Sequence, residues 1–249
     1  MGAGPGAGDL LTLRALKLIE AASVVFFDAL VGDEVLAMVP PGVAQVAVGK
    51  RSGRHSLDQP SITDLIVHAA KGGERVVRLK GGDPSIFGRS AEELAAIRAA
   101  GLTVGVCPGV TAASAAAAAA GVSLTLRSLA RRLTLLTAHV ADGAVAGHDW
   151  ARLADADATL AIYMGKAAAE GVAAGLTGAG LPPGTPCLLV ESASLEAERV
   201  WRCALSGLGA AAARAGEGPL IILIGRALAC DRRRGPESPS GIAAPTWRD

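Results

Sequence analysis

Short apolar runs rich in β-branched residues alternate along this chain with stretches rich in alanine and leucine. Such runs suit buried strands, and the longer stretches between them suit helices. This alternation is typical of α/β proteins with a largely parallel sheet, and we predict that fold class. The expected strands are 24–27, 43–48, 75–79, 102–107, 133–137, 159–163, 187–190, 200–203 and 220–224.

The chain is long enough for two small lobes, and we place their boundary inside the run of small residues from Gly109 to Gly121. The expected units are an N-terminal lobe of residues 1–114 and a C-terminal lobe of residues 115–229. The last two predicted strands look antiparallel, which predicts a mixed sheet in the second lobe. The tail 230–249 is rich in arginine, proline and serine, and we expect it to be disordered.

Composition argues against several classes of protein. A formal net charge of +1 gives no global basic field for nucleic acid, and 3% aromatic residues supply few platforms for base stacking. The four cysteines lack the spacing of a zinc site, so no metal is expected. No apolar run approaches the roughly 20 residues of a membrane span, and no signal-peptide pattern is present. We therefore expect a cytoplasmic protein without a nucleic-acid or membrane partner.

Four polar or glycine-rich turns lie at strand ends or helix starts, at residues 2–9, 48–59, 78–89 and 107–113. Glycine allows the backbone to approach a ligand, and a helix N-terminus offers unpaired N–H groups. Each turn by itself is compatible with an ordinary turn or a solvated loop. Because ligands of open α/β sheets bind beyond the carboxyl ends of the strands, we expect these turns to meet at one site.

Local patterns within these turns leave alternatives open. Gly2, Gly4 and Ala7 match a dinucleotide-binding fingerprint, with Asp28 in the place of its ribose-binding acid. No strand precedes Gly2, and a second glycine turn would stay unexplained, which makes a nicotinamide-dependent oxidoreductase the weaker hypothesis. Lys80 and Arg89 flank that second turn and favour an anion site there.

Helix boundaries are also marked in the sequence. Ser90 followed by Glu93 predicts a capping box at the start of a helix, and Gly101 predicts the end of that helix. The first helical pattern is expected to begin at Leu10, directly after the first glycine turn.

Taken in order and spacing, the turns resemble those of the tetrapyrrole (precorrin) methylases, in particular the branch that C-methylates uroporphyrinogen III. The resemblance covers residues 2–228. Its most specific segments are Gly2-Ala3-Gly4-Pro5-Gly6, Val48-Gly49-Lys50-Arg51, Arg78-Leu79-Lys80-Gly81-Gly82-Asp83-Pro84, Leu124-Thr125-Leu126-Arg127 and Tyr163-Met164-Gly165.

The resemblance implies a two-lobed tetrapyrrole methylase fold, with a mostly parallel sheet in the N-terminal lobe and a mixed sheet in the C-terminal lobe. It further implies a homodimer that holds S-adenosylmethionine between the lobes and releases S-adenosylhomocysteine. The implied reaction converts uroporphyrinogen III to precorrin-2 through precorrin-1, in siroheme or cobalamin biosynthesis. The residues implied to line the cofactor are Pro5, Gly81, Gly82, Asp83, Ile86, Thr111, Ala112, Met164 and Ala193.

The same resemblance assigns chemical roles. Asp28 matches the position of a proton acceptor and Lys50 that of a proton donor, while Arg89, Glu92 and Arg127 match positions for substrate binding or proton handling. These residue types suit the reaction, because an electron-rich pyrrole attacks a methyl group and then loses a proton to a base. Arginine forks bind the carboxylates of such a substrate in bidentate fashion.

Two departures from the family pattern motivate an alternative. Ala7 stands where the family usually has an aspartate, and Leu126 stands where it usually has a histidine. Few apolar residues precede Gly2, so we expect a truncated or misassigned start of the first strand. The alternatives are therefore a catalytically weakened paralogue that binds tetrapyrrole or cofactor, and another precorrin methyltransferase.

Overall fold

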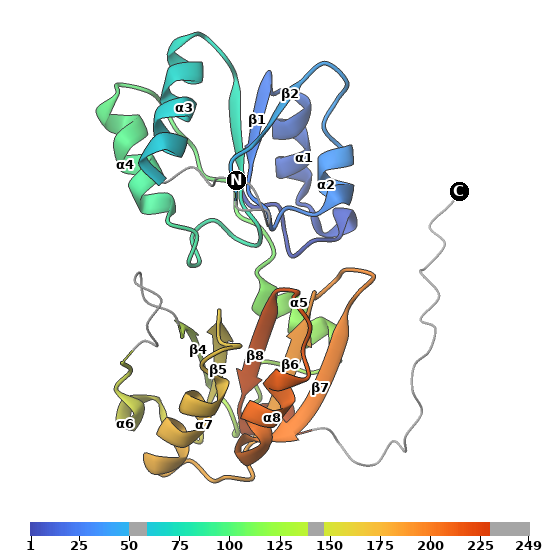
Figure 1. The fold of residues 1–249 in the computed structure, drawn as a ribbon, viewed down its shortest axis with the longest axis vertical. Coiled ribbons are helices and arrows are strands. Elements are labelled where there is room, and N and C mark those ends of the chain that lie inside the picture. The colour runs from blue at the N-terminus through green and yellow to red at the C-terminus, as the bar shows by residue number, and fades with distance from the viewer. Residues whose placement is uncertain (50–58, 139–146, 230–249) are drawn as a thin grey trace.

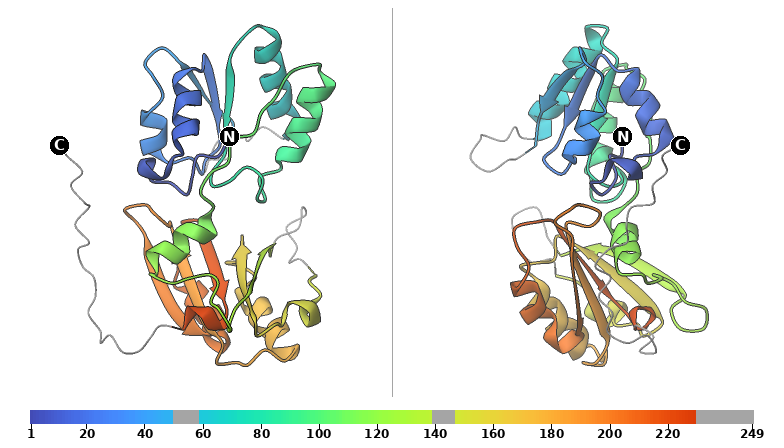
Figure 2. Two further views of the ribbon diagram at one scale, coloured as in Figure 1. Left: turned by 180° about the vertical axis from the view of Figure 1, so that it is seen from behind. Right: turned by 90° about the vertical axis from the view of Figure 1, so that its right-hand side faces the viewer.

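The computed structural model describes residues 1–49, 59–138 and 147–229, which form two α/β lobes, with α5 (Ala112–Ala119) lying on the sheet of the C-terminal lobe (Figure 1, Figure 2). The predicted tail 230–249 lies outside these residues. The predicted boundary between residues 114 and 115 falls inside α5, and the division into domains stays a prediction.

The N-terminal lobe contains a three-stranded parallel sheet in the order β2-β1-β3. Side chains of the central strand β1 alternate between two buried clusters, with Val25 on one face and Val24 and Phe26 on the other. Because both faces are covered, the strand is apolar throughout. The elements are η1 (Gly8–Leu10), α1 (Leu13–Glu20), β1 (Val24–Phe27), α2 (Asp33–Ala37), β2 (Ala44–Ala47), α3 (Gln59–Lys71), β3 (Val76–Leu79) and α4 (Ser90–Ala99).

The C-terminal lobe contains a five-stranded sheet in the order β4-β5-β8-β6-β7. β4 and β5 are parallel, whereas β8 is antiparallel to β5 and β6, and β7 is antiparallel to β6. The predicted α/β class and the mixed second sheet are therefore confirmed. The elements are β4 (Arg132–Thr137), α6 (Trp150–Leu153), β5 (Ala158–Tyr163), α7 (Ala169–Gly178), β6 (Pro186–Glu191), β7 (Arg199–Ala204), η2 (Leu205–Gly207), α8 (Leu208–Ala213), β8 (Leu220–Ile224) and η3 (Arg226–Leu228).

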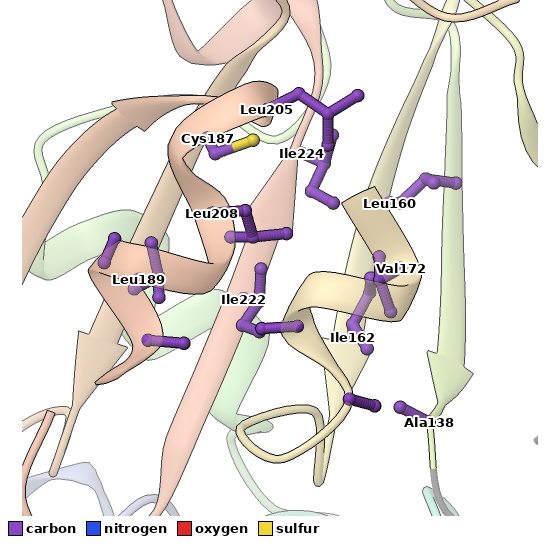
Figure 3. Close-up of a cluster of buried hydrophobic side chains, with 14 of the residues drawn as sticks. Ala138, Leu160, Ile162, Val172, Cys187, Leu189, Leu205, Leu208, Ile222 and Ile224 are labelled. Carbon is purple, nitrogen blue, oxygen red and sulfur yellow. The ribbon is translucent and has the colours of Figure 1, made fainter. Parts of the chain in front are cut away.

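Two apolar clusters cover the two faces of this second sheet. On one face, Leu160, Ile162 and Ile222 pack with residues of α7 and α8, as Figure 3 shows for Val172 and Leu208. On the other face, Leu223 and its neighbours pack against the small side chains of α5. A helix made almost entirely of alanine can lie close to a sheet, because it presents little more than its backbone and methyl groups.

Three local predictions are wrong. Residues 102–107 form no strand in the described structure. The short segment Met1–Gly4 separates Cys107 from the end of β3, and the backbone bond between this segment and residues 102–107 is the one from Gly2 N to Cys107 O. The first α-helix begins at Leu13, where Thr12 caps it by accepting the N–H of Ala15 at 3.2 Å.

The predicted capping box at Ser90 is the third error. α4 begins at Ser90 itself, and the Ser90 hydroxyl donates to the carbonyl of Pro84. Glu93 instead points to Lys80. The predicted end of this helix is confirmed, since Gly101 follows it with a φ of +78°.

None of the helices in the described part combines the length and the apolar character of a membrane span. Within the same residues, no group of three or more His, Cys, Asp and Glu side chains could hold a metal ion.

Candidate functional site

The glycine turn near the N-terminus lies against the glycine turn that follows β3. Gly4 N donates to Gly82 O at 3.2 Å, and Gly82 N donates to Gly4 O at 2.6 Å. Gly2 N donates to Cys107 O at 2.9 Å on the other side of the same segment. Three turns that are far apart in the sequence therefore share one network of backbone hydrogen bonds.

The packing among these turns leaves no room for side chains. A Cβ atom on Gly109 would lie 2.3 Å from Gly82 O, and one on Gly2 would lie 2.6 Å from the Gly109 backbone. Gly82 has a φ of +67°, and a Cβ there would meet no atom within 4 Å, so its outer side is open to a ligand. Glycine is thus required twice for close approach and once for a left-handed backbone.

Asp83 fastens two of these turns together. Its Oδ2 accepts the Gly109 N–H at 3.0 Å, and its Oδ1 accepts the Ser85 N–H at 2.8 Å and also the Ser85 hydroxyl. Burial would raise the pKa of the Asp83 carboxyl, but the hydrogen bonds from Ser85 and Gly109 hold it below its ordinary value. Asp83 is therefore an ionised carboxylate that fixes the shape of the glycine turns.

Contacts between the lobes occur beside these turns. Ala7 N donates to Ser194 Oγ at 3.1 Å, and Gly6 lies so close to Leu195 that a Cβ would come within 2.5 Å of its side chain. The ring of Phe87, in the loop after β3, lies 5.0 Å from the ring of Tyr163 at the end of β5. We call this region, formed by residues 2–8, 81–89 and 109–113 of the first half and 163–164 and 192–195 of the second, the interlobe junction.

Tyr163 ties the junction to α5. Its hydroxyl is hydrogen-bonded to the hydroxyl of Thr111 and accepts the N–H of Ala113 at 3.3 Å. The Tyr163 side chain therefore contacts Phe87, in a loop of the first lobe, and also the start of α5.

Left-handed backbone conformations concentrate at the interlobe junction. Phe87, Met164, Ser192 and Ser194 have φ angles of 52°, 55°, 51° and 71°. Such conformations are costly for residues other than glycine and cluster at ligand-binding sites. All nine predicted cofactor residues lie on segments of the junction: Pro5, Gly81, Gly82, Asp83, Ile86, Thr111, Ala112, Met164 and Ala193.

Asp28 lies at the carboxyl end of β1, next to the glycine turn that follows β3. Its Oδ1 accepts the N–H of Leu30 at 3.1 Å and that of Gly81 at 3.4 Å, and its side chain is 23% exposed. Arg78 Nη2 lies 3.8 Å from its other oxygen. This carboxylate is therefore held in a fixed orientation while part of it stays accessible.

Lys50 lies outside the described residues, but the segment that leads to it reaches Asp28. Val48 N donates to Phe27 O at 2.9 Å, and a Cβ on Gly49 would lie 2.3 Å from Ala29 N. The ends of β1 and β2 are therefore in close contact.

Arg89 and Glu92 form a solvent-exposed pair beyond the second glycine turn. Arg89 Nε and Nη2 donate to the two oxygens of Glu92 at 2.9 Å and 2.7 Å. The hydrogen bond from Arg89 lowers the pKa of the Glu92 carboxyl, and that to Glu92 raises the pKa of Arg89. The arginine fork thus already holds a carboxylate.

Arg127 is not brought to the junction within this chain. It lies in an exposed turn closed by the bridge between Leu126 and Ala130, directly before β4. Arg131 bonds Asp157 at the start of β5, whereas Tyr163 ends that strand at the junction. The length of β5 therefore separates the turn from Tyr163.

Lys80 does not serve the predicted anion site, which corrects that interpretation. Its Nζ lies 2.8 Å from Glu93 Oε1, and both side chains are only 6% exposed. Sequence reasoning missed Glu93, because the Ser90–Glu93 spacing imitates a helix cap. It also missed Ser194 and the central role of Tyr163, since neither contact follows from local sequence.

A pocket of about 420 Å³ lies elsewhere, at the opposite end of the C-terminal sheet. Its lining includes Asp155, Leu181, Thr185 and Arg226, and it contains none of the predicted site residues. The candidate site is therefore the interlobe junction, whose segments carry the nine predicted cofactor residues.

Replacing Tyr163 by phenylalanine is expected to weaken several-fold the binding of S-adenosylhomocysteine, the product ligand that the family resemblance implies. The ring against Phe87 remains, but the bonds to Thr111 and Ala113 are lost, at about 0.5–1.5 kcal/mol per hydrogen bond. Isothermal titration calorimetry measures the change. Thr177→Val, which removes a hydroxyl from the exposed end of α7, is the control. An unchanged Kd in Tyr163→Phe would contradict the prediction.

Comparisons with known proteins agree with this geometry. The family model "Tetrapyrrole (Corrin/Porphyrin) Methylases" matches residues 1–209. The uroporphyrinogen-III C-methyltransferase of Paracoccus denitrificans is 43% identical over 249 residues, which is 100% of this chain and 86% of the relative. The chain spans about half the length of the siroheme synthases that it also matches.

Two solved structures share the fold. Uroporphyrin-III C-methyltransferase from Thermus thermophilus, complexed with S-adenosylhomocysteine, has a TM-score of 0.77 and 35% identity, with 92% of this chain and 96% of that chain covered. The cobalt precorrin-4 methyltransferase CbiF has a TM-score of 0.81 and 29% identity, with 92% and 94% covered.

Proposed function

The chain belongs to the tetrapyrrole (corrin/porphyrin) methylase family, and from this premise we propose that it is an S-adenosylmethionine-dependent methyltransferase. Its proposed reaction is C-methylation of uroporphyrinogen III to precorrin-2 through precorrin-1, for siroheme or cobalamin biosynthesis. The 35% identity to the Thermus uroporphyrin-III enzyme, against 29% to the precorrin-4 enzyme, favours this branch.

The observation that carries the proposal is the meeting of distant glycine turns at the interlobe junction. Gly4 with Gly82, and Gly109 with Asp83, bring the segments of the proposed cofactor residues together. The dinucleotide alternative is disfavoured, because the Gly2–Gly4 segment pairs with residues 80–82 and Asp28 accepts the N–H groups of Leu30 and Gly81.

The residues at the junction fit S-adenosylmethionine. Gly82 is open on its outer side, which allows close backbone approach, and Met164 is 53% exposed beside the Tyr163 ring. The segment around Ala193 has left-handed backbone at Ser192 and Ser194, and Ser194 Oγ accepts the N–H of Ala7 from the first glycine turn. The proposed binding residues are therefore those named above, with Asp83 acting mainly by holding the turns in place.

The proposed chemistry needs positioning and one base. When bound, S-adenosylmethionine would supply a methyl group from its sulfonium: the S–C bond would break as the ring carbon of the pyrrole bonds to the methyl in line, and the electron pair would stay on a neutral thioether. The attack uses an electron pair of the pyrrole and leaves a cationic ring that must lose a proton. Asp28 is the proposed acceptor of that proton, and Lys50 the proposed donor at the porphyrinogen.

Arg89, Glu92 and Arg127 are the proposed substrate residues. Arg89–Glu92 is a solvent-exposed ion pair that water screens strongly, so a substrate carboxylate can replace Glu92 at little cost. Arginine suits this exchange because its planar fork binds carboxylates in bidentate geometry.

We further propose a homodimer in the cytoplasm. Leu126 and Leu133 are 47% and 40% exposed near Arg127, and apolar side chains of this size favour a partner surface. The free thiols of Cys107, Cys187 and Cys203 suit a reducing compartment. Light scattering on the purified protein tests the dimer, and a monomeric mass would contradict it.

Incubation with methyl-labelled S-adenosylmethionine and uroporphyrinogen III tests the function. The expected result is a tetrapyrrole with two added methyl groups by mass spectrometry. No transfer to any tetrapyrrole would overturn the proposal. Calorimetric binding without turnover would instead support the weakened paralogue, which the departures at Ala7 and Leu126 motivate. Turnover of a later precorrin alone would assign another reaction of the family.

A further inference from the structure

A buried cluster of charged side chains lies behind Asp28. Glu93, in the first turn of α4, accepts a hydrogen bond from Lys80 Nζ at 2.8 Å through its Oε1. Arg78 Nε lies 3.4 Å from the same oxygen, while Arg78 Nη2 lies 3.8 Å from Asp28 Oδ2. We call Asp28, Arg78, Lys80 and Glu93 the buried charge cluster.

The cluster is shielded from solvent and held in place by further bonds. The side chains of Lys80 and Glu93 are each 6% exposed, and that of Arg78 is 11% exposed. Gln59 Nε2 donates to Glu93 Oε1 at 2.8 Å, and Arg78 Nη1 donates to Leu79 O at 2.6 Å. Screening by water is therefore weak, and a change in one charge is felt by the others.

The formal charges of the cluster balance. Two cations face two carboxylates, so each buried ion has a partner. Burial lowers the pKa of Lys80, although its hydrogen bond to Glu93 acts in the opposite direction. Burial would raise the pKa of Glu93, but Lys80 and Arg78 bring it below its ordinary value. Glu93 therefore stays ionised and neutralises part of the positive charge behind Asp28.

We propose that Glu93 is a positioning residue of the reaction, which holds Arg78 between two carboxylates and so sets the proton affinity of Asp28. This inference rests on the proposed function, in which Asp28 accepts the proton. Without Glu93, the charges of Arg78 and Lys80 act on Asp28 uncompensated and stabilise its carboxylate. Asp28 then becomes a weaker base.

The surroundings of Asp28 limit which groups can produce such an effect. Among the described residues, Arg78 of β3 is the charged group in contact with the Asp28 carboxylate. Lys80, which directly follows β3, and Glu93 of α4 lie behind Arg78. The N–H groups of Leu30 and Gly81 also donate to Asp28 Oδ1. The Met1 amino group joins the same surroundings by donating to Arg78 O at 2.8 Å.

Removing one charge of the cluster at a time tests the inference through the direction in which the titration midpoint of Asp28 moves. Glu93→Gln removes a negative charge and is expected to lower the titration midpoint of Asp28. Lys80→Met removes a positive charge and is expected to raise it. The double variant restores the charge balance and is expected to return close to wild type. Carbon-13 NMR of labelled aspartate carboxyls measures the midpoint, with the Asp28 signal identified from Asp28→Asn.

A purely structural role predicts a different outcome, because both single variants would then move the midpoint in the same direction or leave it unmoved. Either result overturns the inference. Asp155→Asn is the control, since it breaks the ion pair with Arg132 at the far end of the C-terminal sheet and is expected to leave Asp28 unchanged. If Lys80→Met does not fold, Lys80→Gln takes its place with the same expected direction.

Measurements of methyl transfer distinguish a failure of this inference from a failure of the proposed function. In the methyl-transfer assay, the acidic limb of the pH–rate profile is expected to move to lower pH in Glu93→Gln and to higher pH in Lys80→Met. A wild-type protein that transfers no methyl group would refute the proposed function, whereas the NMR titration still decides the role of Glu93. An active wild type with unmoved midpoints would refute the inference alone.

Discussion

Replacing Asp28 by asparagine is expected to lower kcat for methyl transfer by about 10²–10⁴-fold, the usual contribution of a positioned general base. Asparagine has nearly the same shape and keeps an oxygen that can accept the N–H groups of Leu30 and Gly81. The fold and the affinity for S-adenosylhomocysteine are therefore expected to remain close to wild type. Steady-state kinetics and calorimetry measure the two quantities separately.

The pH dependence adds a second readout to this prediction. The residual activity of Asp28→Asn is expected to lack the acidic limb, because an amide does not titrate. Asp157→Asn is the matched control, since Asp157 forms a half-exposed ion pair with Arg226 away from the junction. A kcat in Asp28→Asn within about threefold of wild type would remove Asp28 from the chemistry, given the contribution expected of a general base.

The sequence predicts most of the strands, because strands that are buried consist of apolar residues. β1 is apolar throughout since its side chains are buried on both faces, and β8 likewise from Leu220 to Ile224. The failure at residues 102–107 has a different origin. An apolar run becomes a strand only if a neighbouring segment pairs with it, and in the described part of the chain the backbone pairing of residues 102–107 is limited to the bond from Gly2 N to Cys107 O.

Part of the candidate site could likewise be predicted from the sequence, and part of it could not. The glycine turns could be found because glycine marks close approach and left-handed backbone, as at Gly82. The partners of Lys80 and Tyr163 could not, because they join residues 13 and 52 positions apart through tertiary contacts. Ser90 and Glu93 even carry a local pattern with another meaning, and here tertiary charge pairing overrides it.

Replacing Gly109 by alanine is expected to disrupt the interlobe junction and to weaken cofactor binding about tenfold or more. Its Cβ would lie 2.3 Å from Gly82 O and 2.9 Å from the Gly2 Cα, and both are backbone atoms that no rotamer change can move away. Overpacking of this kind costs about 1–3 kcal/mol, and 1.4 kcal/mol corresponds to a factor of ten in Kd. Displacing Gly109 also lengthens its bond to Asp83.

The same segment supplies the control for this substitution. Gly105 lies four residues earlier, where an added Cβ would meet no atom within 4 Å, so Gly105→Ala is expected to bind S-adenosylhomocysteine as wild type does. The comparison separates backbone crowding from a general effect of alanine in an extended segment. By itself, the Pro108–Gly109 sequence suggests only a common turn. A tenfold difference in affinity between the two variants would show that Gly109 is needed where the three turns meet. Equal affinities would mean that the turns can separate without loss of the cofactor site.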